Sequence, residues 1–427
     1  MFKKIIFTLL PIAYLFGQDA QAPAASQQAD FAITNVTIHI GNGTLIPNGT
    51  VQVSKGKIVS VASNSPLPNI TIVNGNGQHL YPGIIAASTN LGLVETASIK
   101  ATHDDEELGD INPSLKAITA YAADSKVINT LRSNGVLLAH IVPQGGTLSG
   151  TSSVVQLDAW HYEDAAYKLN NGIHFNMPAL INRPNPFRQA APDDAVKRAY
   201  DKIDEVKNFL RSAKAYAASE KQPTNLKYES VLGLFNKTQT LFVHADLVKE
   251  LLVAIAIKQE FAINIVIVGG SDSYLIATEL AANQVPVILS EPHSLPSMAD
   301  DAVDQPYKTA SMLQKAGVLF TICQDAGDGF WQQRCLPFQA GTMAAYGLTK
   351  EEALSAITLN AAKILGIDNT TGSIEVGKDA NFFTSTGDVL NMVTSNVTTA
   401  YIQGRSINLT NKQTELANKY KAKYGIK

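Results

Sequence analysis

Hydrophobic and polar positions follow two different patterns along this chain. Between residues 31 and 80, short runs of alternating apolar and polar residues are separated by turns rich in Gly, Asn and Pro. This is the pattern of β-strands joined by tight turns, and it returns at about 370–409. Because neither end has enough strands to enclose a core alone, the pattern predicts one composite β-sandwich domain built from residues 31–80 and 369–412.

The central part of the chain alternates short apolar runs with helical patterns. One predicted helix covers residues 193–217, where Ile203, Val206 and Leu210 recur on one face. Short apolar runs between turn signals indicate buried strands. Eight such runs are the candidate barrel strands: 84–88, 136–142, 153–157, 173–176, 240–244, 264–268, 285–289 and 318–323. The alternation predicts an α/β fold, a (β/α)8 TIM barrel over residues 81–368.

The N-terminal residues have the pattern of an export signal. Two lysines precede an apolar run that ends at residue 17, followed by small and polar residues. This predicts a signal peptide over residues 1–17, with cleavage as late as residue 22, and a periplasmic or extracellular protein. The run is shorter than the ~20 apolar residues of a membrane span, so no stable span is expected after cleavage. Residues 18–30 are predicted to be a linker and residues 413–427 a polar, helical tail.

Composition and charge narrow the function classes. The chain has 427 residues, 45% of them hydrophobic, and a formal net charge of −3. This charge gives no electrostatic argument for binding nucleic acid or an anionic membrane, and it leaves a homo-oligomer open. Cys323 and Cys335 are the only cysteines. They do not have zinc-finger spacing, and either a disulfide or two free thiols fits an exported protein.

The segment YPGIIAASTNLG, residues 81–92, brings small polar side chains to the end of a buried strand. It resembles the first barrel strand of the amidohydrolase superfamily, in the branch of imidazolonepropionase-like and metal-dependent dipeptidase-like proteins. That strand reads roughly P-G-hydrophobic-hydrophobic-D-x-H-x-H, and its two histidines bind a catalytic metal. In this chain Ser88 and Asn90 stand in the places of the histidines, and Ala86 stands in the place of the aspartate.

Further segments carry the same resemblance over nearly the whole mature chain, among them FVHAD, ICQDAGD and GSIEVGKDANFF. FVHAD places His244 where the family has a metal-binding histidine, and ICQDAGD places Asp325 where the family has its proton-transferring aspartate. In the family the metal lowers the pKa of a bound water and polarises the scissile carbonyl, while the aspartate moves the proton. The predicted fourth and sixth strands end near Asn176 and Gly269 and offer no such ligand.

The resemblance implies hydrolysis of a carbon–nitrogen bond in a small cyclic amide or peptide-like amide at the C-terminal face of the barrel. Asp325 and His244 are the predicted catalytic residues. Predicted substrate contacts are Ser88, Asn90, Trp331 and Arg334. One divalent metal, zinc, iron or manganese, is predicted on His244 and Asp325, with His140, His174 and His293 as weaker candidate ligands. A catalytic zinc normally has three protein ligands, so the family's binuclear site is not expected without the first-strand histidines.

Three interpretations stay open at this point. The first is a hydrolase with a rebuilt site, working with a metal or with His244 and Asp325 as an acid–base pair. The second is a catalytically inactive barrel that binds a small ligand in its mouth, and the third is an exported scaffold. The segment WHYEDAAY, which begins at Trp160 and follows the predicted third strand, either packs or stacks on a substrate through Trp160 and Tyr162.

Overall fold

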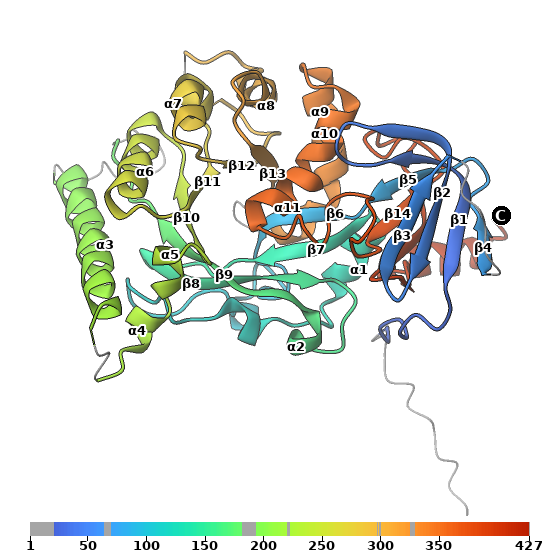
Figure 1. Cartoon of the computed structure of the whole chain (residues 1–427), viewed down its shortest axis with the longest axis horizontal. Coiled ribbons are helices and arrows are strands. Elements are labelled where there is room, and N and C mark those ends of the chain that lie inside the picture. The colour runs from blue at the N-terminus through green and yellow to red at the C-terminus, as the bar shows by residue number, and fades with distance from the viewer. Residues whose placement is uncertain are drawn as a thin grey trace, which may run out of the picture.

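The computed structural model describes residues 21–63, 70–181, 194–219, 223–296, 298, 300–324 and 329–426. Two units lie side by side: a helix-covered barrel sheet and a smaller sheet formed by both ends of the chain (Figure 1). This architecture confirms the predicted α/β fold with a TIM-type barrel and a composite sheet domain. The predicted signal peptide lies outside the described residues, and no described helix is both long and apolar enough to cross a bilayer.

The barrel sheet has eight strands in the order β13-β12-β11-β10-β9-β8-β7-β6. They are β6 (Ile84–Thr89), β7 (Val136–Ile141), β8 (Leu148–Gln156), β9 (Ala166–Asn176), β10 (Thr240–Ala245), β11 (Ile265–Gly269), β12 (Val287–Ser290) and β13 (Phe320–Cys323). Between the two outermost strands, Gln333 Nε2 donates hydrogen bonds to the carbonyls of Ser88 (2.7 Å) and Gln324 (2.9 Å). This side chain therefore ties β6 to the segment that follows β13.

Strand β8 runs opposite to its neighbours, which departs from the regular (β/α)8 repeat. It pairs antiparallel with both β7 and β9, whereas the strands from β9 to β13 pair parallel. The reason is the length of the β7–β8 connection, residues 142–147. A parallel return needs a crossover of about a dozen residues, and this loop instead turns back through Gly145 and Gly146, both at positive φ.

The reversal of β8 changes where its flanking loops lie. The β7–β8 loop reaches the C-terminal ends of the parallel strands, which form the barrel mouth. The β8–β9 connection, with Trp160, Tyr162 and the single turn α2 (Tyr162–Ala165), lies at the opposite end. These two aromatic residues therefore do not lie at the mouth.

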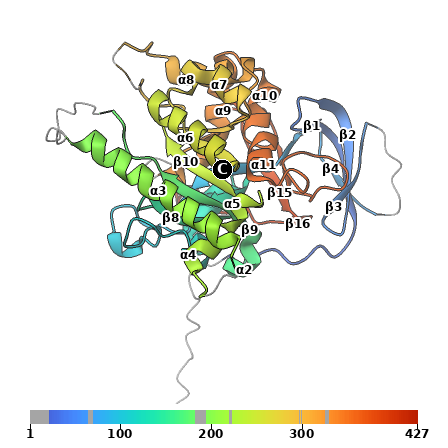
Figure 2. The same ribbon diagram turned by 60° about the vertical axis from the view of Figure 1, so that its left-hand side comes forward.

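Helices cover the outside of the barrel. Figure 2 shows α3 as the longest of them, with α5 packed between it and β10. The predicted helix at 193–217 is confirmed as α3, which buries Ile203, Val206 and Leu210. The helices are α1 (Lys126–Arg132), α3 (Ala195–Ala217), α4 (Leu226–Glu229), α5 (Leu232–Phe235), α6 (Val248–Phe261), α7 (Ala277–Ala282), α8 (Gln305–Lys315), α9 (Leu336–Ala345), α10 (Lys350–Ala356), α11 (Leu359–Leu365) and α12 (Lys412–Tyr424).

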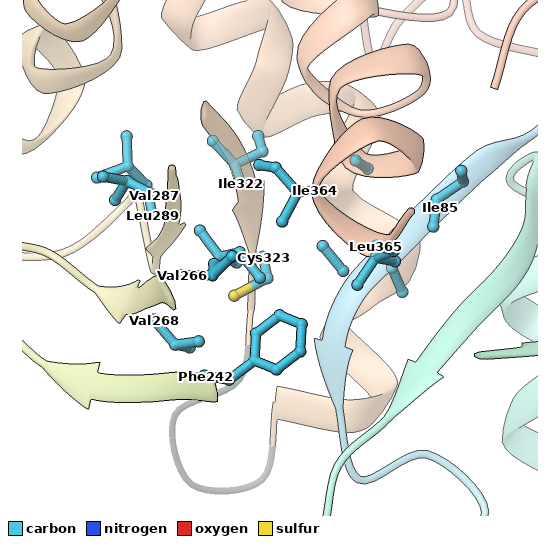
Figure 3. Close-up of a cluster of buried hydrophobic side chains, with 14 of the residues drawn as sticks. Ile85, Phe242, Val266, Val268, Val287, Leu289, Ile322, Cys323, Ile364 and Leu365 are labelled. Atoms are coloured by element: carbon cyan, nitrogen blue, oxygen red, sulfur yellow. The ribbon is translucent and has the colours of Figure 1, made fainter. Parts of the chain in front are cut away.

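The barrel core consists of the parallel strands and the helices behind them. Strands of a parallel sheet are buried on both faces, so they read as continuous apolar runs, as in IVIVG of β11. Figure 3 shows one cluster of this core, to which Cys323, Phe242, Val266 and Ile322 belong. Cys323 is fully buried and, like Cys335, is a free thiol.

The composite domain is one hydrogen-bonded sheet in the order β16-β15-β14-β5-β1-β2-β3, with β4 also paired to β1. Strand β5 joins the two chain ends because it pairs parallel with β1 and antiparallel with β14. The strands are β1 (Phe31–His39), β2 (Leu45–Ser54), β3 (Lys57–Ala62), β4 (Thr71–Asn74), β5 (His79–Pro82), β14 (Phe382–Ser385), β15 (Val397–Ile402) and β16 (Arg405–Ser406). Strand β5 leads through Gly83 into β6, so this domain lies at the N-terminal ends of the barrel strands.

A buried ion network fastens the two units together. Asp158, just after β8, pairs with Arg132 of α1 and with Arg405 of β16. The N-terminal segment joins the same network, because the amide of Ala24 donates to Asp158 Oδ2 (2.9 Å) and Arg405 donates to the Ala24 carbonyl (3.1 Å). Residues 21–29, within the predicted linker, therefore lie against both units.

Candidate functional site

The centre of the barrel mouth contains a pair of histidines. His244 lies near the end of β10 and is partly exposed, while His174 lies on the neighbouring β9 and is fully buried. Parallel pairing aligns Phe242 with His174 and His244 with Asn176, so the two histidine side chains meet between the strands. His174 Nδ1 lies 2.9 Å from His244 Nε2, which is hydrogen-bonding distance.

The surroundings of His174 keep it neutral. Its ring stacks on Phe242 with centroids 4.9 Å apart and an interplanar angle of 5°. Burial holds the pKa of His174 well below its ordinary value. Its Nε2 has no hydrogen-bond partner among the described residues, so its one polar contact there is with His244. His174 is thus placed to fix the orientation and the tautomer of His244.

His140 lies deeper in the barrel, and its ring nitrogens contact groups of the core. Its Nδ1 is 2.9 Å from the Ala87 carbonyl and its Nε2 is 3.1 Å from the side-chain amide of Asn171. Burial lowers the pKa of His140 to about 4, so the ring is neutral at pH 7. With Nδ1–H donating to Ala87, Nε2 must accept, and the amide nitrogen of Asn171 supplies the donor once that amide is rotated by 180°. Both ring nitrogens of His140 are therefore engaged in packing contacts.

His293 lies apart from the other histidines. It follows β12, and its Nε2 is 2.8 Å from Thr342 Oγ1 on α9. It lines a separate cavity of about 910 Å³ together with Cys335 and Thr342. The structure therefore brings His174 and His244 together and leaves His293 on another element.

Ser88 and Asn90, which are predicted to stand in the places of the family's first-strand histidines, are both buried, one on β6 and one just after it. Asn90 donates from Nδ2 to Asp105 Oδ2 (3.0 Å), and the other oxygen of Asp105 lies 3.9 Å from His103 Nδ1. Asp105 is only 7% exposed, so this carboxylate of the loop after β6 turns inward instead of facing solvent. Asn90 thus holds the loop after β6, while Ser88 is fully buried and its carbonyl binds Gln333.

The ends of β9 and β11 are also occupied by structural contacts. Asn176 donates from Nδ2 to the Gly146 carbonyl (2.8 Å) and to Ser149 Oγ (2.9 Å), which fixes the β7–β8 loop. Gly269 has a φ of 107°, and a Cβ there would lie 2.9 Å from the backbone oxygen of Ala245. The strand-six position therefore has no space for the side chain of a metal ligand.

An arginine and a tryptophan lie on the rim after β13. Asp325 falls in residues 325–328, outside the described part of the chain. The following turn η4 (Gly329–Cys335) carries Trp331, which is 37% exposed, and Arg334, whose guanidinium lies 4.8 Å from the indole centroid. Arg334 also donates to the Trp331 carbonyl (3.3 Å), and it has no carboxylate partner among the described residues. This pair therefore presents a positive charge on an aromatic surface.

The described residues do not form a metal site of the family type. They contain no group of three His, Cys, Asp or Glu side chains that could surround one ion. A catalytic zinc needs about three protein ligands, and His244 is the one residue within the described ranges that was predicted at a family ligand position with a suitable donor. The roles of Asp105 and Asn176 were not predicted, because their partners are distant in sequence and depend on the direction of β8.

Comparison with known proteins places these features in a family. The sequence profile of the amidohydrolase family matches residues 214–407, which include His244 and the segment around Asp325. The imidazolonepropionase of Fusobacterium nucleatum is 24% identical over 365 residues, covering 78% of this chain and 84% of the relative. The imidazolonepropionase of Shewanella frigidimarina is 65% identical over 37 residues, a segment that spans only 9% of either chain.

A solved structure supports the same relationship. An amidohydrolase from Thermotoga maritima MSB8 is similar to this chain with a TM-score of 0.76 and 26% sequence identity. The match covers 88% of this chain and 99% of that protein. The likeness therefore includes both the barrel and the sheet built from the chain ends.

Proposed function

Because this chain belongs to the amidohydrolase superfamily, we propose that it hydrolyses a carbon–nitrogen bond of a small amide at the barrel mouth. A cyclic amide or a dipeptide-like amide is the proposed substrate. The observation that carries the proposal is His244, a family site residue retained at the end of β10 and held by His174 at 2.9 Å. A buried, hydrogen-bonded partner behind a functional imidazole is the arrangement that orients acid–base residues.

The proposed chemistry uses His244 to move a proton. Water adds to the amide carbonyl, its proton must be removed, and a proton must reach the leaving nitrogen. In this proposal the imidazole of His244, oriented by its hydrogen bond to Nδ1 of His174, takes up and returns the proton. Asp325, which occupies the family position for proton transfer, shares this role in the proposal.

The rim pair provides substrate contacts in this proposal. Arg334 would bind a carboxylate or carbonyl oxygen of the substrate, and Trp331 would pack against its apolar part. An amide that carries a carboxylate is therefore the preferred substrate class. Ser88 and Asn90 are less suited to direct contact, because both are buried and Asn90 is bonded to Asp105.

A divalent metal on His244 and Asp325 stays a prediction. The described donor set does not fit the family site, so the metal content of the protein is the first measurement. Protein purified without chelator and without a histidine tag is assayed for zinc, iron and manganese. About one equivalent that disappears in His244→Ala would show a rebuilt metal site; a metal-free protein with turnover would show an acid–base site.

Turnover is tested on a panel of cyclic amides and dipeptides. The proposal predicts that Asp325→Asn and His244→Ala abolish hydrolysis while the melting temperature is maintained. His161→Gln is a matched control, since His161 is exposed on the β8–β9 connection at the other end of the barrel. No hydrolysis by the wild-type protein of any member of the panel would contradict the proposal.

A second candidate function is a ligand-binding barrel without catalysis. It is favoured by the first-strand and sixth-strand positions, where Asn90 bonds Asp105 and Gly269 leaves no space for a ligand side chain. This alternative predicts that a substrate-like amide raises the melting temperature equally in wild type and Asp325→Asn, with no turnover in either.

Export through the predicted signal peptide is also proposed, and detection of the mature protein outside the cytoplasm tests it.

A further inference from the structure

A groove lies at the end of the barrel opposite the mouth, where the composite sheet attaches. It has a volume of about 900 Å³, within the ~300–1,000 Å³ typical of small-molecule sites, and such sites favour domain interfaces. Its lining comes from residues 23–27, the β2–β3 turn at 55–57, the end of β8 with the β8–β9 connection, Asp379, and the β15–β16 turn at 403–405. Nothing in the proposed function involves this groove.

Trp160 is the most conspicuous side chain of the groove. It is 66% exposed, although tryptophan is highly buried on average in folded proteins. Its loop is held in place, because the Trp160 amide donates to Asp164 Oδ2 (2.9 Å) and Gln156 Nε2 donates to the Asp164 carbonyl (3.3 Å). The exposed indole therefore belongs to a loop that is held by hydrogen bonds, and its ring faces solvent.

Part of the polar lining is already fully engaged. Arg405 donates to Asp158 Oδ2 (3.0 Å) and to Gln156 Oε1 (3.2 Å). Lys57 pairs with Asp379 at 2.5 Å, and the other oxygen of Asp379 accepts from Tyr167. These groups form a fixed wall and have little capacity left for a ligand.

Other polar side chains of the groove keep hydrogen-bonding capacity. Lys55 has no ion pair and Gln403 has no side-chain hydrogen bond within the described ranges, and both are exposed. Asp164 uses Oδ2 for the Trp160 amide, which leaves Oδ1 as an acceptor. An ammonium, an amide and a carboxylate oxygen thus line the same groove as an exposed indole.

The charges of the groove balance and so disfavour an ion as ligand. Its cations are Lys55, Lys57 and Arg405, and its carboxylates are Asp164 and Asp379, with Asp158 directly behind Arg405. A groove with balanced charge does not concentrate anions such as nucleotides or cations such as polyamines. A neutral ligand with one apolar face and many hydroxyl groups at its edge matches this lining.

We propose that this groove binds a neutral oligosaccharide. The C–H face of one sugar ring packs on the indole of Trp160, and the edge hydroxyls bond to Asp164, Lys55 and Gln403. The segment WHYEDAAY is thereby assigned to a site that is separate from the mouth. A sugar-binding surface at that end would hold the protein on a glycan while the barrel mouth stays accessible.

The chain's two tryptophans make a direct test available. Trp331→Phe leaves Trp160 as the only indole, and its fluorescence is followed while maltotetraose, cellotetraose or chitotetraose is added. The expected result is a saturable change in emission with at least one of these sugars. Calorimetry on otherwise wild-type protein should show the same binding lost in Trp160→Ala and weakened about tenfold in Asp164→Asn.

Two outcomes would overturn the proposal. One is the absence of any saturable signal with all three sugars up to about 10 mM. The other is emission from Trp160 that depends on protein concentration but not on sugar, with dimers in sedimentation, which would identify a contact between copies of this chain. Binding is also measured in Asp325→Asn, so that failure of the mouth chemistry and failure of the groove are told apart.

Discussion

His174 Nδ1 and His244 Nε2 lie 2.9 Å apart on neighbouring parallel strands of the barrel. The first histidine is buried and stacked on Phe242, and the second reaches the mouth. A hydrogen bond of this length fixes the ring of His244 and decides which of its nitrogens carries a proton. The buried partner therefore orients the partly exposed one.

The first prediction replaces His174 by phenylalanine. His174→Phe keeps the aromatic stack on Phe242 and removes the only hydrogen bond that His174 makes among the described residues. We expect the melting temperature to stay within a few degrees, while kcat falls roughly 10- to 100-fold at unchanged KM, because His244 loses its orienting partner. Steady-state kinetics on the best amide of the panel measure this. Equal kcat in wild type and variant would show that His174 only packs.

The second prediction concerns acid stability. Burial lowers the pKa of His140 to about 4, whereas the unfolded chain has a histidine pKa of about 6.5. Between these values the unfolded state binds a proton that the native state does not, so the free energy of unfolding falls as pH decreases from about 6.5 to 4. The contribution of His140 to this loss is about 3 kcal/mol, and His174 acts in the same direction.

Urea denaturation across this pH range tests the second prediction. His140→Gln keeps a donor and an acceptor for Ala87 and Asn171 but does not titrate, so its stability should depend less on pH. His161→Gln removes an exposed imidazole and should leave the slope unchanged. A slope in His140→Gln equal to that of wild type would show that other groups cause the acid sensitivity.

Much of the fold could be predicted from apolar periodicity, and the direction of one strand could not. Local patterns of apolar residues predict buried parallel strands, such as residues 264–268, and the amphipathic helix at 193–217. The sequence pattern of strand β8 does not depend on whether the strand runs parallel or antiparallel to its neighbours. The short loop through Gly145 and Gly146 determines its direction. Because β8 is reversed, Trp160 lies at the end of the barrel opposite the mouth.

The candidate site was predicted in part for a related reason. His244 is predicted as a site residue because FVHAD resembles a family segment, and Ser88 and Asn90 because they stand where that family has its first-strand histidines. The hydrogen bond from Asn90 to Asp105 could not be predicted. In the sequence, Asp105 is one of several neighbouring acidic residues, and such residues are usually exposed to solvent. The contact between His174 and His244 depends on strand register, which the sequence pattern does not specify.

The third prediction concerns the cysteines, both of which are free. Cys323 is fully buried in the cluster of Figure 3, while Cys335 is partly exposed and lines the cavity beside His293. A thiol reagent should therefore modify one cysteine in the native protein and both after denaturation without reductant. Cys335→Ser should abolish the native reaction. The absence of any reactive thiol in the unreduced, denatured protein would instead demonstrate a disulfide.

The fourth prediction removes the charge at the junction of the two units. Asp158 is 2% exposed. Its carboxylate pairs with Arg132 and Arg405 and accepts a hydrogen bond from the amide of Ala24. In Asp158→Asn the buried guanidinium of Arg132 and the partly buried one of Arg405 lose their counter-charge, and breaking a buried pair from one side costs about 3–5 kcal/mol. Chemical denaturation at pH 7 should show a loss of that size.

The matched control is an exposed ion pair of the same barrel. Lys202 and Asp110 lie 3.4 Å apart with about half of each side chain exposed to solvent. Solvent screens such a pair, so Lys202→Gln should cost less than about 1 kcal/mol. If Asp158→Asn were no more costly than this control, the buried network would not be what fastens the sheet domain to the barrel. A loss several times larger would instead show that the N-terminal segment, α1 and β16 are held together through one carboxylate.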